Sequence, residues 1–149
     1  MASCCSTENH NPVKNPCPVC GTAGKAVAIS SLYHQIRFPD NLTVPAADYY
    51  LCAKPDCALG YYSDTGLCFK KSQLREAEHI AAGWLCYCFD ISKADYRAAL
   101  DNRNADEIKK FVIEQTRIGS CACSSRNPSG QCCLADFKRV EKVYANEPQ

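Results

Sequence analysis

The sequence has no basic N-terminal region followed by an apolar run, and no stretch approaches the roughly 20 apolar residues that span a membrane. It therefore predicts neither a secretory signal nor membrane insertion, and we expect a cytoplasmic protein. An excess of one charge is also missing, because 17 Lys and Arg stand against 16 Asp and Glu for a formal net charge of +1. Without a basic field, nucleic acid is not an expected partner.

Cysteine, by contrast, is abundant, with 13 residues in a chain of 149. At this density, cross-links by disulfide bonds or by bound metal ions are expected. Disulfides are disfavoured in a reducing compartment, the count is odd, and the CxC, CxxC and CC spacings are typical of metal thiolates. The sequence therefore favours bound metal over a disulfide framework.

The first segment, residues 1–15, is rich in Ser, Thr, Asn and Pro, and it predicts a flexible arm. The adjacent thiols Cys4 and Cys5 lie within it. They offer a soft cation such as Cu(I) two sulfur ligands. The alternative is a pair of solvent-exposed thiols without a special role.

A first metal knuckle is predicted at Cys17 and Cys20, where Pro presets the turn and Gly21 relieves the backbone. A thioredoxin-like redox motif would instead open a helix, but the Gly-rich residues 21–24 are poor helix formers. The knuckle is therefore the better interpretation.

A second knuckle is predicted between two strands, residues 48–52 and 58–63, because the turn that joins them carries Cys52 and Cys57. Four thiolates with no vacant position make a structural zinc site, which folds the chain and does not catalyse. The alternative is four buried cysteines without metal. Cys68, on a third predicted strand, could substitute as a ligand, but a place in the core is the expected role. The predicted zinc ligands are Cys17, Cys20, Cys52 and Cys57.

Two further groups of thiols, at residues 86–88 and 121–133, enclose a segment that reads as a helix hairpin. Ser92 and Asp95 have the spacing of a capping box that begins the first helix, and the second is predicted to end at Gly119. An antiparallel helix pair returns the chain to its start, so both thiol groups meet near the beginning of a third helix. There the helix dipole favours the negative charge of thiolates. Such a gathering of sulfurs predicts an iron–sulfur cluster.

The motif Cys86-x-Cys88, a spacer of 34 residues, Cys123 and the ending Asn-Pro-Ser-Gly-x-Cys-Cys together resemble the [2Fe-2S] domain of bacterioferritin-associated ferredoxin type. They resemble more closely the N-terminal domain of the copper chaperone CopZ, which also carries an upstream zinc site. The resemblance implies cluster ligands at Cys86, Cys88, Cys123 and Cys133. Cys132 is the alternative to Cys133 as the fourth ligand, and Cys121 is the alternative to Cys123 as the third.

One departure from the CopZ pattern concerns copper delivery. Only 16 residues follow Cys133, and Met1 is the only methionine, so no heavy-metal-associated domain with its Met-x-Cys-x-x-Cys loop is expected here. The sequence thus predicts a [2Fe-2S]/zinc domain that stands alone.

The expected fold is α+β, with a zinc-ribbon-like β lobe at residues 16–83 followed by a helical [2Fe-2S]-binding lobe at residues 84–149. The expected function is one-electron transfer linked to copper or other heavy-metal handling, for example reduction of Cu(II) to Cu(I), with a redox protein, metal transporter or chaperone as partner. No catalytic dyad is visible, so we expect an electron-transfer or metal-binding protein. The alternatives are a metal carrier or sensor that uses spare thiols, and a structural module with two zinc ions.

Overall fold

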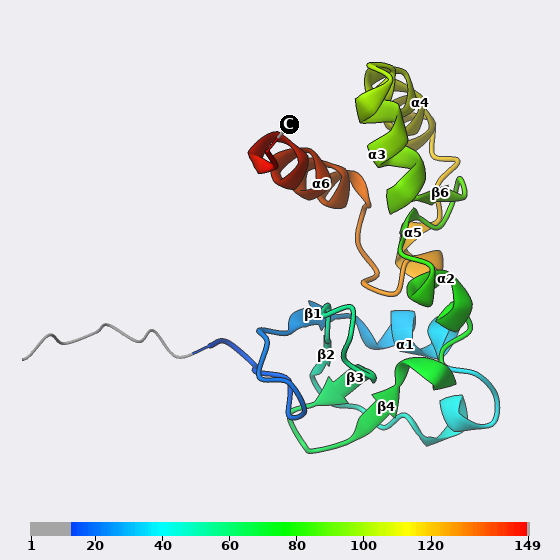
Figure 1. Ribbon diagram of the computed structural model, residues 1–149. Helices are drawn as coiled ribbons and strands as arrows, with labels where there is room; N and C mark the ends of the chain where they lie inside the picture. Colours follow the sequence, from blue (N-terminus) through cyan, green and yellow to red (C-terminus); the bar gives the residue numbers. More distant parts are fainter. Residues whose placement is uncertain (1–12, 149) are drawn as a thin grey trace, which may run out of the picture.

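The computed structural model describes residues 13–148 and has two parts, a small sheet covered by one helix and a group of three longer helices (Figure 1). We call the first part the β lobe and define it by β1–β4 and α1. Its strands are antiparallel and lie in chain order. They are β1 (Lys25–Val27), β2 (Tyr49–Leu51), β3 (Leu59–Ser63) and β4 (Cys68–Lys70). The predicted strands at 48–52 and 58–63 are confirmed as the neighbours β2 and β3.

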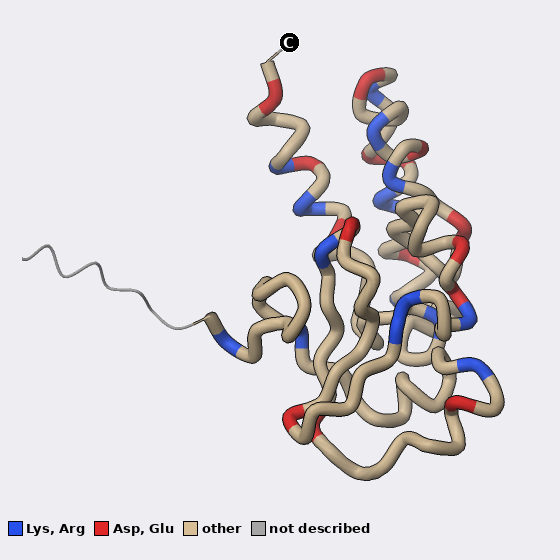
Figure 2. Tube along the Cα trace, turned by 60° about the horizontal axis from the view of Figure 1, so that its bottom comes forward, with Lys and Arg blue, Asp and Glu red and all other residues tan. Residues whose placement is uncertain are grey.

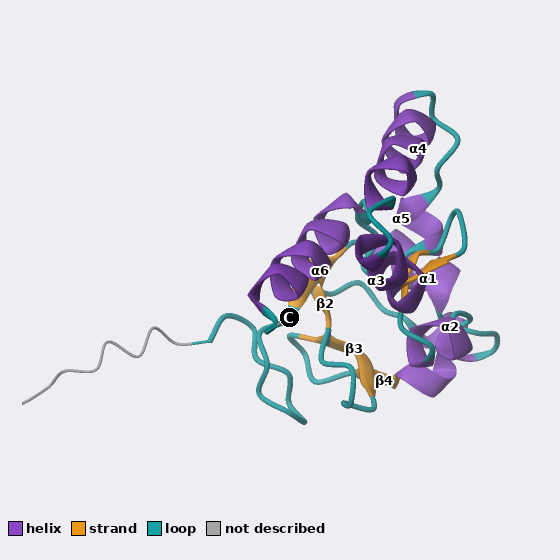
Figure 3. Ribbon diagram, turned by 45° about the horizontal axis from the view of Figure 1, so that its top comes forward, coloured by secondary structure: helices purple, strands orange, loops and turns teal. Residues whose placement is uncertain are grey.

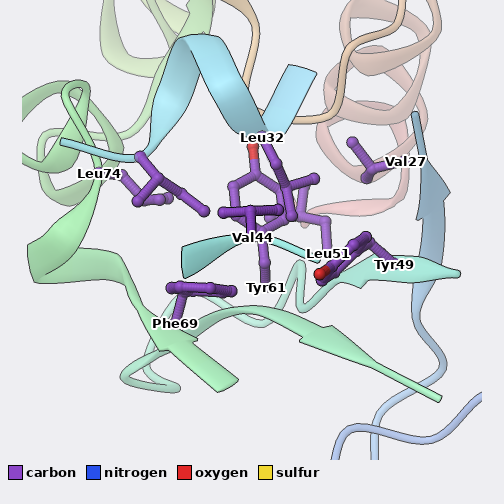
Figure 4. Packing of buried hydrophobic residues seen from close by; sticks show 9 residues of the cluster. Val27, Leu32, Val44, Tyr49, Leu51, Tyr61, Phe69 and Leu74 are labelled. Atoms are coloured by element: carbon purple, nitrogen blue, oxygen red, sulfur yellow. The ribbon is translucent and has the colours of Figure 1, made fainter. Parts of the chain in front are cut away.

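The core of the β lobe lies between the sheet and α1 (Ile29–Gln35). Successive side chains of a strand point to opposite faces of the sheet, so Tyr49 and Leu51, two residues apart on β2, both face this core. Figure 4 shows Leu32 of α1 beside the side chains that rise from the sheet. The buried cluster comprises Val27, Leu32, Ile36, Val44, Tyr49, Leu51, Tyr61, Phe69 and Leu74.

The expected core position of Cys68 is wrong. Cys68 lies on β4 but is exposed, whereas the next residue, Phe69, is buried. Successive side chains of a strand point to opposite faces, so the larger aromatic side chain occupies the core and the thiol faces outward.

The second part, the helical lobe, is defined by α3 (Lys93–Asp101), α4 (Ala105–Arg117) and α6 (Leu134–Asn146). The predicted capping box begins α3, because Asp95 N donates to Ser92 Oγ at 3.0 Å and Ser92 N donates to Asp95 Oδ2 at 3.1 Å. The three helices share one core, in which the rings of Tyr96 and Phe137 meet edge to face with centroids 4.7 Å apart.

Several short elements outside the four-stranded sheet and the longer helices were not predicted. They are α2 (Ala77–Ala81), the hairpin of β5 (Trp84–Cys86) and β6 (Ile91–Ser92), α5 (Cys123–Arg126), and the 3₁₀ turns η1 (Asp40–Thr43) and η2 (Lys71–Gln73). Each has two to five residues, too few for a hydrophobic period to be visible in sequence. In Figure 3, α5 lies close to α1, and the two helices pack together.

Charged residues of both signs alternate along the described chain and gather into no single field, as Figure 2 shows. Among the helices of residues 13–148, none is long and apolar enough to cross a membrane.

The aromatic pair of the helical lobe supports a first prediction. Phe137→Ala should lower the free energy of unfolding by about 3–5 kcal/mol, because Phe137 is fully buried between the helices. Chemical denaturation followed by helical circular dichroism measures this change. Val143→Ala, on the exposed side of α6, is the control and should change it by less than about 0.5 kcal/mol. Equal effects of the two substitutions would contradict the described packing.

Candidate metal centres

The first knuckle is a closed turn held by its own backbone. Cys17 N donates to Thr22 O at 2.8 Å, and Gly21 N donates to Cys17 O at 2.8 Å. Gly21 has a φ of 75°, a conformation that glycine adopts without strain. The turn therefore brings the thiols of Cys17 and Cys20 to one side of the chain.

The second knuckle joins β2 to β3. Cys52 directly follows β2, with its N–H donating to Gly60 O at 2.9 Å, and Cys57 N donates to Lys54 O at 3.2 Å. The ammonium of Lys71 closes the turn from outside, because Nζ donates to the carbonyls of Lys54 and Cys57 at 2.6 and 2.7 Å. No sequence pattern points to this lysine, which comes from η2.

The two knuckles bring four sulfurs together. The Sγ atoms of Cys17, Cys20, Cys52 and Cys57 all lie within 4.8 Å of one another, with Cys17 to Cys57 at 3.9 Å and Cys20 to Cys52 at 3.5 Å. A tetrahedral zinc with Zn–S bonds of about 2.3 Å separates its sulfurs by about 3.8 Å. Cys20 is partly exposed and the other three are buried. The donor set and its spacing therefore fit a closed four-thiolate zinc site.

The thiols of this group differ in acidity. Hydrogen bonds with Thr22, first through its side chain and then through its backbone, lower the pKa of Cys20 to about 6. Burial raises the pKa of Cys52 to about 12. Cys20 thus ionises before Cys52, and a bound cation would stabilise the buried thiol of Cys52 as a thiolate.

The second set of predicted ligands lies where the β5–β6 hairpin, α5 and α6 meet. Cys86 ends β5 and Cys88 lies in the hairpin turn, Cys123 begins α5, and Cys133 is the residue before α6. The Sγ atoms of Cys88 and Cys123 are 3.8 Å apart. The thiols of Cys86 and Cys133 share a hydrogen bond. A short hairpin, and not the start of a helix, presents the CxC motif.

These four sulfurs form two pairs. Across residues 13–148, the zinc-type group is the one set of three or more such ligands whose atoms all lie within 4.8 Å of each other. The second set is more open, with one close pair from Cys88 and Cys123 and another from Cys86 and Cys133. A two-iron cluster takes two protein ligands on each iron. Two separate pairs match that requirement, whereas a single zinc would need one compact group.

Burial distinguishes the neighbouring thiols of the CC pair. Cys133 is 2% exposed and its thiol is hydrogen-bonded to that of Cys86, while Cys132 is exposed. Of the other competing pair, Cys123 is the thiol with its sulfur beside that of Cys88, and Cys121 is partly exposed. Burial thus distinguishes Cys133 from Cys132, and the short distance to Cys88 distinguishes Cys123 from Cys121.

Backbone N–H groups surround the second set. Ala122 N donates to Cys88 Sγ at 3.2 Å, and the 13-residue α6 directs its N-terminus toward Cys133. The bond from Cys133 lowers the pKa of Cys86 to about 6 despite burial, and the pKa of Cys133 is raised by the same bond and by its own burial. Donors of this kind stabilise thiolates and the negative charge of a bound metal cluster.

Loss of one sulfur tests the compact site. Cys52→Ser should abolish stoichiometric zinc binding and unfold the β lobe, because the binding energy of a structural zinc is folding energy. Metal analysis measures the zinc content, and near-ultraviolet circular dichroism of the buried tyrosines measures the folding of the β lobe. Cys68→Ser removes an exposed thiol of the same lobe and should change neither. Retention of one tightly bound zinc in Cys52→Ser would contradict the four-sulfur site.

Comparisons with known proteins bear on the zinc knuckles and on the fold. Residues 14–75 match a family model of the CopZ zinc-binding domain, described as "Zinc binding domain". The solved N-terminal domain of CopZ from Archaeoglobus fulgidus is similar with a TM-score of 0.65 and 23% identity, over 85% of this chain and 97% of that one. A search among curated proteins gives no match.

The predicted α+β fold and the predicted resemblance are thus confirmed. The region matched by the family contains both cysteine knuckles, and the similarity in structure extends beyond it into the helices. The chain therefore contains a CopZ-type zinc-binding domain and has the fold of the CopZ N-terminal domain.

Proposed function

We propose that the protein binds one zinc and one [2Fe-2S] cluster and transfers single electrons in the handling of copper or another heavy metal. The observation that carries the proposal is the arrangement of four thiols in two pairs, Cys88 with Cys123 and Cys86 with Cys133. The pairs come from three separate elements, which is how a fold assembles a cluster site rather than a chance contact of neighbouring thiols.

The zinc has a structural role in this proposal. Its ligands are Cys17, Cys20, Cys52 and Cys57, which fill a tetrahedral coordination sphere and leave no position for a substrate. The electron-transfer chemistry therefore belongs to the second set of thiols.

When bound, the cluster supplies reversible one-electron chemistry. The chain holds it through Cys86, Cys88, Cys123 and Cys133. The N–H of Ala122 and the N-terminus of α6 lie where they stabilise added negative charge, so these groups favour the reduced form. Cys86 and Cys133 are buried, which limits the access of water to that side.

The link to copper rests on the likeness to the CopZ N-terminal domain. A reduced cluster has one electron to give, and Cu(II) becomes Cu(I) by accepting one, so the transfer balances without a further reactant. A redox protein must then re-reduce the cluster, and a metal transporter or chaperone must take the Cu(I). A reducing cytoplasm, which keeps the unused thiols free, suits this role.

A second candidate function is a metal carrier or sensor. It is favoured by the accessibility of Cys132, which is exposed, and of Cys121, which is partly exposed, both next to the proposed cluster ligands. Cys4 and Cys5, the other thiols predicted for this role, lie outside the described residues. In this function the spare thiols pass a soft ion and no electron moves.

Metal analysis of anaerobically purified protein, paired with electron paramagnetic resonance, tests the proposal. We expect two irons and one zinc per chain, and one electron should convert a silent spectrum into that of a spin of one half. Cys88→Ser should lose the iron and keep the zinc, because Cys88 is remote in sequence from both zinc knuckles. Cys68→Ser is the matched control and should keep both. Colourless protein with two zincs and no iron would support the structural two-zinc module instead.

The choice of fourth ligand has its own test. Cys133→Ser should lose the cluster, because the buried thiol of Cys133 pairs with Cys86, while Cys132→Ser should keep a normal iron content and spectrum. Visible absorption and iron analysis of the two variants measure this. The reverse result would assign the position to Cys132.

A further inference from the structure

We infer that three side chains of the β lobe, Gln35, Ser31 and Tyr61, are positioning residues that hold the ligand-bearing segment 123–133, so that the zinc-bound β lobe governs retention of the cluster. This inference rests on the proposed function. None of the three is a ligand, and each acts on the backbone between Cys123 and Cys133.

Gln35 and Ser31 lie at the end and the middle of α1 and are almost fully buried. The side-chain amide of Gln35 donates to the carbonyls of Ser125 and Arg126 at 2.8 and 2.9 Å. The hydroxyl of Ser31 donates to Ser124 O at 2.8 Å. Three consecutive carbonyls of α5 thus receive hydrogen bonds from α1.

These donors matter because α5 has only four residues. The last carbonyls of any helix lack partners within it, and a single turn is too short to be stable alone. In α5, the side chains of Ser31 and Gln35 from α1 donate hydrogen bonds to these unpartnered carbonyls. Without these hydrogen bonds, α5 would lose the contacts that fix its orientation. The thiol of Cys123 would then lose its position, because Cys123 is the first residue of α5.

The rest of the segment is also held against the β lobe. Tyr61, a fully buried residue of β3, donates its hydroxyl to Pro128 O. Gly130 lies so close to α1 that a Cβ there would come within 2.4 Å of Ser31 Oγ. Asn127 Oδ1 accepts from both N and Oγ of Ser129, at 2.9 and 2.8 Å, which makes the turn rigid by itself. The turn therefore moves with the β lobe and fixes the approach to Cys133.

The zinc site is connected to these positioning residues through the sheet. Cys52 follows β2 and Cys57 precedes β3, so the four-sulfur group joins the two strands at the end from which the chain runs to Tyr61. Tyr61 and Leu51 share one core with Leu32 of α1. Loss of zinc would thus loosen Tyr61 and α1 together. The two lobes have separate cores, so loss of the cluster would leave the core of the β lobe in place and need not release the zinc.

The test compares Gln35→Leu with Gln73→Leu in the full chain after cluster reconstitution. Gln73 is the matched control, because its side chain bonds Asp40 and Lys70 inside the β lobe and makes no bond to segment 123–133 in the described structure. We expect Gln35→Leu to release iron about tenfold faster than wild type, since each of the two partly buried carbonyls loses its donor. Gln73→Leu should release it at the wild-type rate. Zinc content and the circular dichroism of all three should match.

Two milder variants keep the test decisive if Gln35→Leu folds poorly. Ser31→Ala and Tyr61→Phe each remove one hydroxyl and should each hasten iron release, with a changed visible circular dichroism of the cluster as the sign of altered ligand geometry. Removal of zinc by a chelator should hasten it in wild type as well. Wild-type iron retention in all folded variants, or after zinc removal, would overturn the inference.

Failure of the proposed function looks different. If wild type itself binds no iron, the cluster assignment fails, and hydrogen exchange of residues 123–131 in the zinc-loaded protein then tests the positioning alone. Gln35→Leu should exchange faster there than wild type and Gln73→Leu. Equal exchange in the three proteins would show that α1 does not hold the segment.

Discussion

The four-sulfur group of Cys17, Cys20, Cys52 and Cys57 is the constraint on which the rest of the structure depends. The strands of the β lobe have three to five residues each, and such short strands need either a large core or a cross-link. The sulfur group joins the turn before β1 to the turn between β2 and β3, so it fixes the strand order near one end of the sheet. α1 covers one face of the sheet with apolar side chains. The β lobe is then rigid enough to present donors to a segment about 90 residues away in sequence.

The two sets of thiols use different geometry for different chemistry. Zinc is a single ion and requires one compact group of sulfurs, which two tight turns provide. A two-iron cluster is larger, and the four thiols that we propose for it come from a hairpin, a one-turn helix and the residue before α6. Local turns are sufficient for the first set. The second needs the two lobes to be placed correctly against each other.

Much of this arrangement could be predicted from the sequence, and the remainder has physical reasons. The knuckle cysteines and the Ser92 capping box have fixed local spacing, so their pattern is visible directly. The hairpin that carries Cys86 and the single turn that begins with Cys123 are too short for periodicity to reveal. Gln35 and Ser31 could not be found either, because a buried polar side chain on a short helix has no sequence signal until its partner carbonyls are known. Cys68 was misassigned because alternation on a three-residue strand depends on register.

The hydrogen bond from Ser31 to Ser124 also has a consequence for the order in which the protein assembles. A chain made from its N-terminus has all four knuckle cysteines and α1 available before α5 is synthesised, and domains fold as they emerge. The β lobe with its zinc can therefore be complete while the C-terminal helices are still absent. It then serves as a template on which segment 123–133 docks, so insertion of the proposed iron–sulfur cluster would be the last step of biogenesis.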